Sequence, residues 1–190
     1  MPALEMSKNT TALVVIDLQK GIATRPTQPH TAKDVVRNAA RLIAAFRKNG
    51  MPVFLVHVVS TPETMLKVQS DETFSRTGPM PPDWSEFIPE IGHATTDIVI
   101  GKKQWGAFYG TDLELQLRRR GMDTIVLCGI ATDYGVESTA RIAYEFGFQQ
   151  IFAEDAMSSM SAEQHHNAVN YIFKRMGRVR TTDEILAGME

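Results

Sequence analysis

Residues suited to proton transfer follow two apolar segments that we expect to be buried strands. Asp17 comes directly after the apolar segment 12–16, and Lys102 and Lys103 follow the apolar segment 98–100. A carboxylate at the end of a buried strand is partly desolvated and available for proton transfer. A lysine that reaches the same place would orient the carboxylate and stabilise negative charge. The alternatives are that Asp17 is only a turn or cap residue and that one lysine is only solvated.

The segment 128–141 is a third candidate, because it predicts a strand that passes through a tight turn into a helix. Free backbone N–H groups near Tyr134 and Gly135 would then face a ligand and stabilise an oxyanion or a bound carboxylate. The alternative is that the glycines of this segment only serve the geometry of the turn. The backbone alone does not decide between these interpretations.

Short β-branched apolar segments along the chain predict strands that are buried on both faces. They cover residues 12–16, 53–59, 98–100, 124–128 and 150–153, with 179–180 as a weak sixth. Between them lie segments whose apolar residues recur with the period of an amphipathic helix. The expected helices are one over residues 31–49, one that Thr111 or Asp112 caps, one that ends at Gly147 and one that ends at Gly177.

This alternation predicts an α/β fold, a three-layer α/β/α doubly wound and mainly parallel sheet of six strands, for which the order 3-2-1-4-5-6 is the most common. Ligands of such sheets bind outside the carboxyl ends of the strands, where the strand order reverses. The reversal places Asp17 and Gln19 opposite the segment 129–135. Topology therefore predicts the position of a site.

The composition favours a small-molecule substrate over nucleic acid or a membrane. The 190 residues carry 20 basic and 22 acidic side chains, and this net charge of -2 gives no field of one sign. No segment approaches the roughly 20 apolar residues that cross a bilayer. Because Cys128 is the single cysteine, no intramolecular disulfide is expected and a cytoplasmic location is favoured. We expect one domain over residues 1–190, with a long connection over residues 60–89.

Three separated motifs together cover the predicted site. They are Ala-Leu-Val-Val-Ile-Asp-Leu-Gln at 12–19, Lys-Lys-Gln-Trp-Gly-Ala-Phe-Tyr-Gly-Thr-Asp at 102–112 and Gly-Ile-Ala-Thr-Asp-Tyr-Gly-Val-Glu-Ser-Thr-Ala at 129–140. In this order they resemble the isochorismatase-like superfamily of cysteine hydrolases, over nearly the whole chain. The resemblance implies that Asp17 and Lys102 are the catalytic aspartate and lysine, and it places the family's nucleophilic cysteine at Gly135. It also implies a non-proline cis peptide between Ile130 and Ala131.

The resemblance extends to the surroundings of the site. It implies a substrate-binding set made of Gln19, Ile130, Ala131, Tyr134, Trp105 and Phe108. It also implies a homo-oligomer, a dimer or a tetramer, and no cofactor. Two positions depart from the family's pattern: Gly106 stands where a serine is usual, and Ile142 stands where an aspartate is frequent.

No metal site is expected from the resemblance. The nicotinamidase branch binds a metal through an aspartate and several histidines after the second strand, where this chain offers only His57. We expect His57 to be a satisfied core histidine. His165 and His166 are adjacent on a predicted helix and point in different directions, so we expect both at the surface.

Gly135 lacks a side chain, and this restricts the chemistry that the site supports. Amide hydrolysis in this family needs a thiolate, and Cys128 is expected to be buried and inert. Vinyl-ether hydrolysis needs only an acid that protonates the alkene carbon, after which water traps the oxocarbenium ion. The family's isochorismatases proper resemble this case. The leading hypothesis is therefore a hydrolase of a small vinyl ether, with Asp17 as general acid and Lys102 as its partner.

Two other hypotheses stay open. The chain is alternatively a non-catalytic small-molecule-binding homologue that has lost the nucleophile, or it has a role in assembly. The protonation state of Asp17 also stays open, because a nearby cation lowers a carboxyl pKa by about 1 to 3 units whereas burial raises it by up to about 3 to 5. The other cations that we place near the site are loop residues, namely Arg25, Lys67 and Arg76.

Overall fold

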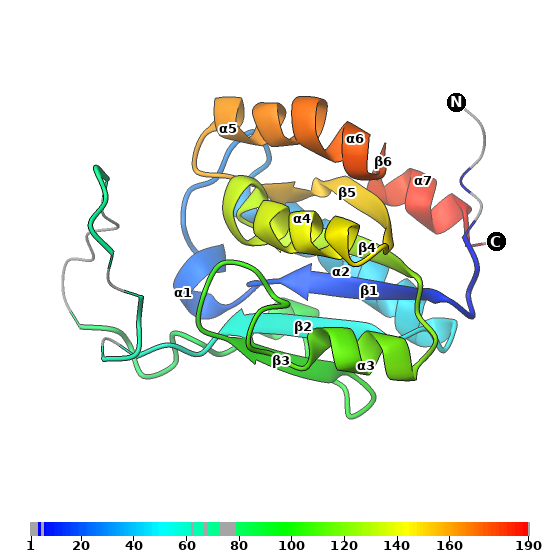
Figure 1. Cartoon of the computed structure of the whole chain (residues 1–190), viewed down its shortest axis with the longest axis horizontal. Coiled ribbons are helices and arrows are strands. Elements are labelled where there is room, and N and C mark those ends of the chain that lie inside the picture. The colour runs from blue at the N-terminus through cyan, green and yellow to red at the C-terminus, as the bar shows by residue number, and fades with distance from the viewer. Residues whose placement is uncertain (1–3, 5, 62, 67, 73–78, 190) are drawn as a thin grey trace.

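A parallel sheet of six strands in the order β3-β2-β1-β4-β5-β6 forms the centre of the fold (Figure 1). The structure is a computed structural model that describes residues 4, 6–61, 63–66, 68–72 and 79–189. The strands are β1 Thr11–Ile16, β2 Val53–Val58, β3 Ile98–Lys102, β4 Thr124–Ile130, β5 Gln149–Ser158 and β6 Arg178–Arg180. All of their pairings are parallel. The predicted fold class and strand order are therefore confirmed.

The helices lie in two layers, one on each face of the sheet. They are α1 Lys20–Ala23, α2 Ala32–Lys48, α3 Leu113–Arg119, α4 Glu137–Glu145, α5 Ala162–Asn167, α6 Lys174–Met176 and α7 Thr182–Ala187, with a 3-10 segment η1 at Pro89–Ile91 and π-helical segments η2 at Thr132–Val136 and η3 at Ala168–Phe173. Figure 1 shows α2 behind the sheet and α3 and α4 in front of it. None of the helices in the described ranges is both long and apolar enough to cross a membrane.

The central strand β1 shows why the sheet needs a layer of helices on each of its two faces. All six of its residues are buried, and successive side chains point to opposite faces. Leu13 and Val15 join the apolar cluster beneath α2 and α7, whereas Val14 and Ile16 join the cluster beneath α3 and α4. The continuous apolar run of β1 is therefore a strand covered on both faces, as predicted.

The helix expected over residues 31–49 is confirmed as α2, with its caps at the predicted ends. The Thr31 hydroxyl accepts a hydrogen bond from the Asp34 N–H at 3.2 Å, which satisfies a free donor of the first turn. Gly50 follows the last turn with a φ of 68°, a conformation that glycine adopts without strain. For α3, the Leu113 N–H bonds the Thr111 hydroxyl at 3.2 Å.

Strand β5 is longer than the expected segment 150–153, because its middle is irregular. Leu127 of β4 pairs with Phe152, and Gly129, two residues on, pairs with Met157. Five residues of β5 therefore span two residues of β4, and a bulge of this kind re-aims side chains. Polar residues such as Glu154 lie in the irregular stretch, so the apolar pattern ended before the strand did.

Candidate active site

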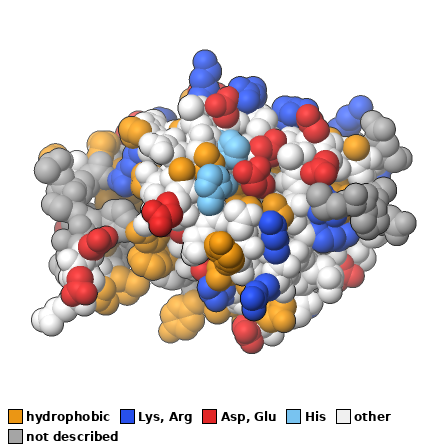
Figure 2. Space-filling view, turned by 90° about the horizontal axis from the view of Figure 1, so that it is seen from above, with side chains coloured by type: hydrophobic (Ala, Val, Ile, Leu, Met, Phe, Trp, Pro, Cys, Tyr) orange, Lys and Arg blue, Asp and Glu red, His pale blue; other side chains and the backbone are white. Residues whose placement is uncertain are grey.

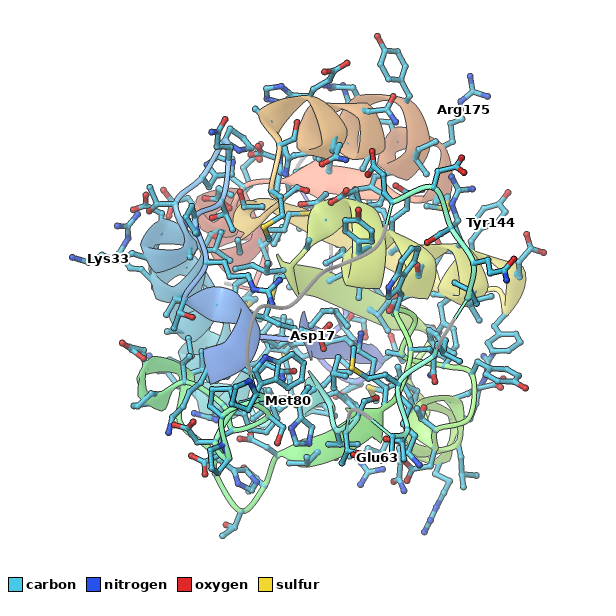
Figure 3. All side chains as sticks on the ribbon, turned by 90° about the vertical axis from the view of Figure 1, so that its left-hand side faces the viewer. Asp17, Lys33, Glu63, Met80, Tyr144 and Arg175 are labelled. Atoms are coloured by element: carbon cyan, nitrogen blue, oxygen red, sulfur yellow. The ribbon has the colours of Figure 1, made fainter. Side chains whose placement is uncertain are left out.

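Asp17 lies at the carboxyl end of β1, as the topology predicted. Its backbone is left-handed, with a φ of 53°, which an aspartate tolerates better than most residues. The Asp17 N–H donates to the Val56 carbonyl of the neighbouring strand at 2.9 Å. Figure 3 looks onto the carboxyl ends of the strands and places Asp17 near the centre of that edge.

Lys102 forms a buried ion pair with Asp17. Its Nζ atom lies 2.8 Å from Asp17 Oδ2. The exposed fractions of Lys102 and Asp17 are 1% and 4%, so water barely screens the pair. Lys102 Nζ also donates to the Trp105 carbonyl. The adjacent Lys103 is exposed, which identifies Lys102 as the lysine that reaches the site.

Burial outweighs the lysine in its effect on Asp17. It raises the pKa of the carboxyl from 3.8 to about 6, although the charge and the hydrogen bond of Lys102 act to lower it. Within the described part of the chain, Asp17 Oδ1 is buried and has no hydrogen-bond partner. One oxygen of the carboxyl is thus held by the ammonium group, and the other is left to carry a proton.

Gly135 faces this ion pair from η2. A Cβ atom added to Gly135 would lie 3.1 Å from Asp17 Oδ2 and 3.3 Å from Lys102 Nζ, and 2.9 Å from Ile16 Cγ2. A side chain at position 135 would therefore point at the pair. Gly129, before it, has a φ of 123°, and a Cβ there would lie 2.0 Å from the Ile16 carbonyl oxygen. Only glycine allows β4 to approach β1 this closely.

A cavity of about 130 Å³ opens onto the ion pair. It is lined by Asp17, Ile22, Arg25, Val58, Lys102, Gln104, Trp105, Ile130, Ala131, Tyr134, Gly135 and Met160. The structure thus brings together both members of the ion pair, Gly135 and four of the expected substrate-binding residues. The rings of Trp105 and Tyr134 meet edge to face, with centroids 4.8 Å apart, and give the cavity an aromatic wall.

Gln19 and Phe108 are not among the described residues that line the cavity. The Gln19 side chain is buried and fixes two backbones, because Oε1 accepts from the Val58 N–H at 2.7 Å and Nε2 donates to the Trp84 carbonyl at 3.1 Å. Phe108 packs edge to face on Phe146, with ring centroids 5.5 Å apart, on the α3 and α4 side of the sheet. Gln19 therefore has a structural role at the end of β1, and Phe108 belongs to the apolar core between the sheet, α3 and α4.

Three other lining residues were not predicted as site residues. Ile22 lies on the short helix α1, Gln104 lies inside the second motif, and Met160 lies on the connection after β5. Arg25 was expected only as one of several loop cations; it is partly buried, and no carboxylate of the described residues forms an ion pair with it. Lys67 and Arg76 lie outside the described residues.

Two expectations about the surroundings are wrong. The Tyr134 N–H is not free to face a ligand, because it donates to the Ala131 carbonyl at 3.2 Å. His165 is not a surface residue: its exposed fraction is 0%, because α5 turns this side chain inward, whereas His166 is exposed as expected.

Other expectations hold. The Ile130–Ala131 peptide is cis. His57 is satisfied as expected, because its Nδ1 atom is hydrogen-bonded to the Ser85 carbonyl at 2.7 Å, but it is only partly buried and so is not a core residue. Cys128 is fully buried, and burial, followed by the charge of Asp155, raises the pKa of its thiol to about 12. A thiol in this environment is inert.

Residues 11–184 match the isochorismatase domain. The isochorismatase family protein YecD of Escherichia coli O157:H7 is 54% identical over 184 residues, which cover 96% of this chain and 98% of that protein. A probable isochorismatase of Pseudomonas chlororaphis is 30% identical over 177 residues, which cover 92% of this chain and 84% of that protein.

Solved structures agree with these sequence matches. An isochorismatase family protein from Burkholderia thailandensis superposes with a TM-score of 0.91 at 44% identity, and the match covers 99% of this chain and 98% of that one. N-carbamoylsarcosine amidase from Thermoplasma acidophilum superposes with a TM-score of 0.73 at 28% identity, over 92% of this chain and 97% of that one.

Proposed function

The chain belongs to the isochorismatase family of hydrolases, and we propose that it hydrolyses a small vinyl ether without a nucleophilic cysteine. The proposal rests on the pKa of the Asp17 carboxyl and on the partners of its two oxygen atoms. Its carboxyl has a pKa of about 6, Oδ2 is held by Lys102, and Oδ1 has no partner among the described residues. A raised pKa of this kind suits a general acid that works near neutral pH.

Asp17 Oδ1 donates its proton to the terminal alkene carbon, and the carbon that bears the ether oxygen becomes an oxocarbenium ion. Water adds to that carbon and returns a proton to the Asp17 carboxylate. The hemiketal then breaks its bond to the ether oxygen, its hydroxyl proton passes to that oxygen, and an alcohol and a carbonyl compound leave. Lys102 stabilises the carboxylate that exists between the two proton transfers.

The absence of a side chain at Gly135 supports this route. A cysteine there would point at the space between Asp17 and Lys102. Glycine leaves that space to the substrate, and it removes the covalent route on which amide hydrolysis depends. The ion pair itself is kept and buried, which a protein that only binds a ligand does not need.

Arg25 supports a negatively charged substrate. It lines the same cavity as Lys102, and because no carboxylate of the described residues forms an ion pair with it, its charge is available to a substrate. A guanidinium group binds a carboxylate through two parallel hydrogen bonds. We therefore assign the cavity to a vinyl ether that carries a carboxylate, with Arg25 as the carboxylate contact and the aromatic wall of Trp105 and Tyr134 against its apolar part.

The test is hydrolysis of carboxylated vinyl ethers in H₂¹⁸O. Because water adds to the former alkene carbon, the alcohol product keeps the ether oxygen and should contain no ¹⁸O, which mass spectrometry measures. Asp17→Asn keeps the shape of the side chain without its acid and should lower kcat by about 10²- to 10⁴-fold, the usual contribution of a general acid. An alcohol product that contains ¹⁸O, or normal turnover by Asp17→Asn, would refute the mechanism. Binding without turnover in any tested compound would favour the non-catalytic homologue.

A further inference from the structure

A second cluster of chemistry-bearing side chains lies outside the cavity. His30 Nε2 is 2.8 Å from Glu154 Oε1, and His165 Nε2 is 3.3 Å from the same oxygen. One donor atom from each of the three residues lies within 4.8 Å of the others. We propose that His30, Glu154 and His165 form a binding site for a divalent transition-metal ion of the zinc class.

Three separate elements bring these residues together. His30 precedes α2, Glu154 stands in the irregular stretch of β5, and His165 lies on α5. Figure 1 shows the connection between α1 and α2 rising beside α5. Two contacts hold it there: the Ser158 hydroxyl donates to the His30 carbonyl at 2.7 Å, and Gln28 pairs with Ser159 in an antiparallel bridge. The three donors are therefore positioned by the fold.

The donor set and its spacing suit zinc. Two imidazole nitrogens and one carboxylate oxygen are ligands that Zn²⁺ accepts, with bonds of about 2.0–2.2 Å. In a tetrahedral site such bonds place the ligand atoms roughly 3.3 Å apart. The nitrogen atoms of His30 and His165 already lie 2.8 and 3.3 Å from Glu154 Oε1. An ion needs only small rotations of these side chains.

The surroundings of His165 also fit a ligand. Its Nδ1 atom is 2.9 Å from the Thr132 hydroxyl. Metal-binding histidines almost always use the second ring nitrogen in such a bond, which orients the ring and presents the other nitrogen to the metal. His165 is fully buried, whereas the side chains of His30 and Glu154 are 28% and 27% exposed. Solvent therefore reaches one side of the cluster, which gives an ion its entry path and a water molecule a place as fourth ligand. In Figure 2, which looks onto the side of the molecule that carries α5 and α6, histidine side chains reach the surface beside acidic ones.

The same contacts hold the cluster together when no metal is bound, because one carboxylate oxygen accepts hydrogen bonds from two imidazoles. The experiment must therefore read metal binding itself. The chain, stripped with a chelator, is titrated with CoCl₂ while its visible absorption is recorded, and with ZnCl₂ in a calorimeter. We expect one ion per chain and the visible bands of Co²⁺ with nitrogen ligands.

The variants distinguish this cluster from other histidines. His30→Asn and Glu154→Gln change partly exposed ligands and should abolish binding, whereas His166→Asn, the exposed neighbour of His165, should bind like the unmodified chain. Thr132→Val keeps all three ligands but removes the hydroxyl from His165, and it should weaken binding by about 10- to 100-fold. Circular dichroism verifies that each variant is folded.

The proposal is overturned if neither ion binds the unmodified chain at up to millimolar concentration. It is equally overturned if His30→Asn and Glu154→Gln bind as the unmodified chain does, or if His166→Asn loses binding as they do. Because the readout is metal binding and not turnover, these results are independent of the vinyl-ether proposal.

Discussion

Asp17 is subject to two opposing influences, since burial disfavours its charged form and Lys102 Nζ, 2.8 Å away, favours it. Burial is the larger, and the resulting pKa of about 6 leaves about a tenth of the molecules protonated at pH 7. Neither influence alone would serve the proposed acid. Without burial, Asp17 would hold no proton near neutral pH, and without Lys102 its carboxylate would be poorly stabilised after the proton has left.

This balance predicts the pH dependence of turnover. The acid must be protonated, so kcat should be level below the Asp17 pKa and fall about tenfold per pH unit as the pH rises above about 6. Lys102→Met removes the cation that lowers this pKa, so the falling limb should move to higher pH while the maximal kcat decreases. Lys103→Met, at the exposed neighbour, should keep the original profile. Rates measured from pH 5 to 9 with melting temperatures alongside decide the matter; a flat or rising profile above pH 6 would exclude Asp17 as the acid.

Arg25 leads to a prediction about affinity. A hydrogen bond to a charged group contributes about 1.5–3 kcal/mol, so Arg25→Gln should raise KM for a carboxylated substrate by about 10- to 100-fold with little change in kcat. A substrate in which an amide replaces the carboxylate should lose this sensitivity. Arg119→Gln, on the exposed face of α3, serves as control. If Arg25→Gln lowers kcat and leaves KM unchanged, Arg25 is not the carboxylate contact.

The ends of the strands could be predicted from the sequence, whereas the course of the connections between them could not. The apolar runs end at Asp17 and near Lys102, and the reversal of strand order brings both beside the turn that contains Gly135. Arg25 and Met160 lie on connections without periodicity, so no sequence pattern reports which way they point. Long-range placement of this kind depends on packing that a local pattern does not contain.

Two other features have signals in the sequence. His165 lies three and four residues before Ala168 and Val169, which are both buried, so it shares their face of the helix. The last helix, α7, begins with a capping box: Thr181 accepts from the Glu184 N–H, and Glu184 accepts from the Thr181 N–H. A threonine followed three residues later by glutamate is a recognisable start signal. The proposed metal site has no such signal, because its three ligands, His30, Glu154 and His165, are distant in sequence.

The turn between β4 and α4 can be tested by restoring a side chain at position 135. Gly135→Cys, in a Cys128→Ser background, would place Cβ about 3 Å from Asp17 Oδ2 and Lys102 Nζ, provided that Ile16 shifts slightly. Asp17 can then accept the thiol proton and Lys102 can stabilise the thiolate, so the thiol should titrate below the ordinary cysteine value of about 8.5. The rate of alkylation against pH measures this.

Ser7→Cys in the same background provides an exposed thiol for comparison. If the two thiols titrate alike in folded protein, then Asp17, Lys102 and the turn do not converge on position 135 in solution. The proposed site would then have to be abandoned. Amide hydrolysis by Gly135→Cys is not required, because a misplacement of about 1 Å can lower a rate by roughly a hundredfold.

In the molecule as a whole, the cavity lies where several strands and connections meet. Its lining comes from the ends of β1, β2 and β3, from the β4 turn and from the connections that carry Arg25 and Met160. The charges elsewhere are mixed, and Figure 2 shows basic and acidic side chains interspersed on the face it presents. The cytoplasmic location, the single domain and the homo-oligomer stay predictions.

Because a cavity ligand contacts all of these elements at once and has no such site in the unfolded chain, it should stabilise the whole fold. At a concentration of 100 Kd the gain is about 2.7 kcal/mol, and for a chain of this size each kcal/mol raises Tm by about 2–4 °C, so the expected rise is about 5–10 °C. A screen of small vinyl ethers and their saturated analogues by thermal shift measures it, with and without a carboxylate. Carboxylated compounds should stabilise the unmodified chain and the Arg119→Gln variant, and should lose most of the shift in Arg25→Gln. Carboxylated compounds that stabilise both arginine variants equally do not bind through Arg25, and if every carboxylated compound behaves in this way, the assignment of an anionic substrate to the cavity fails.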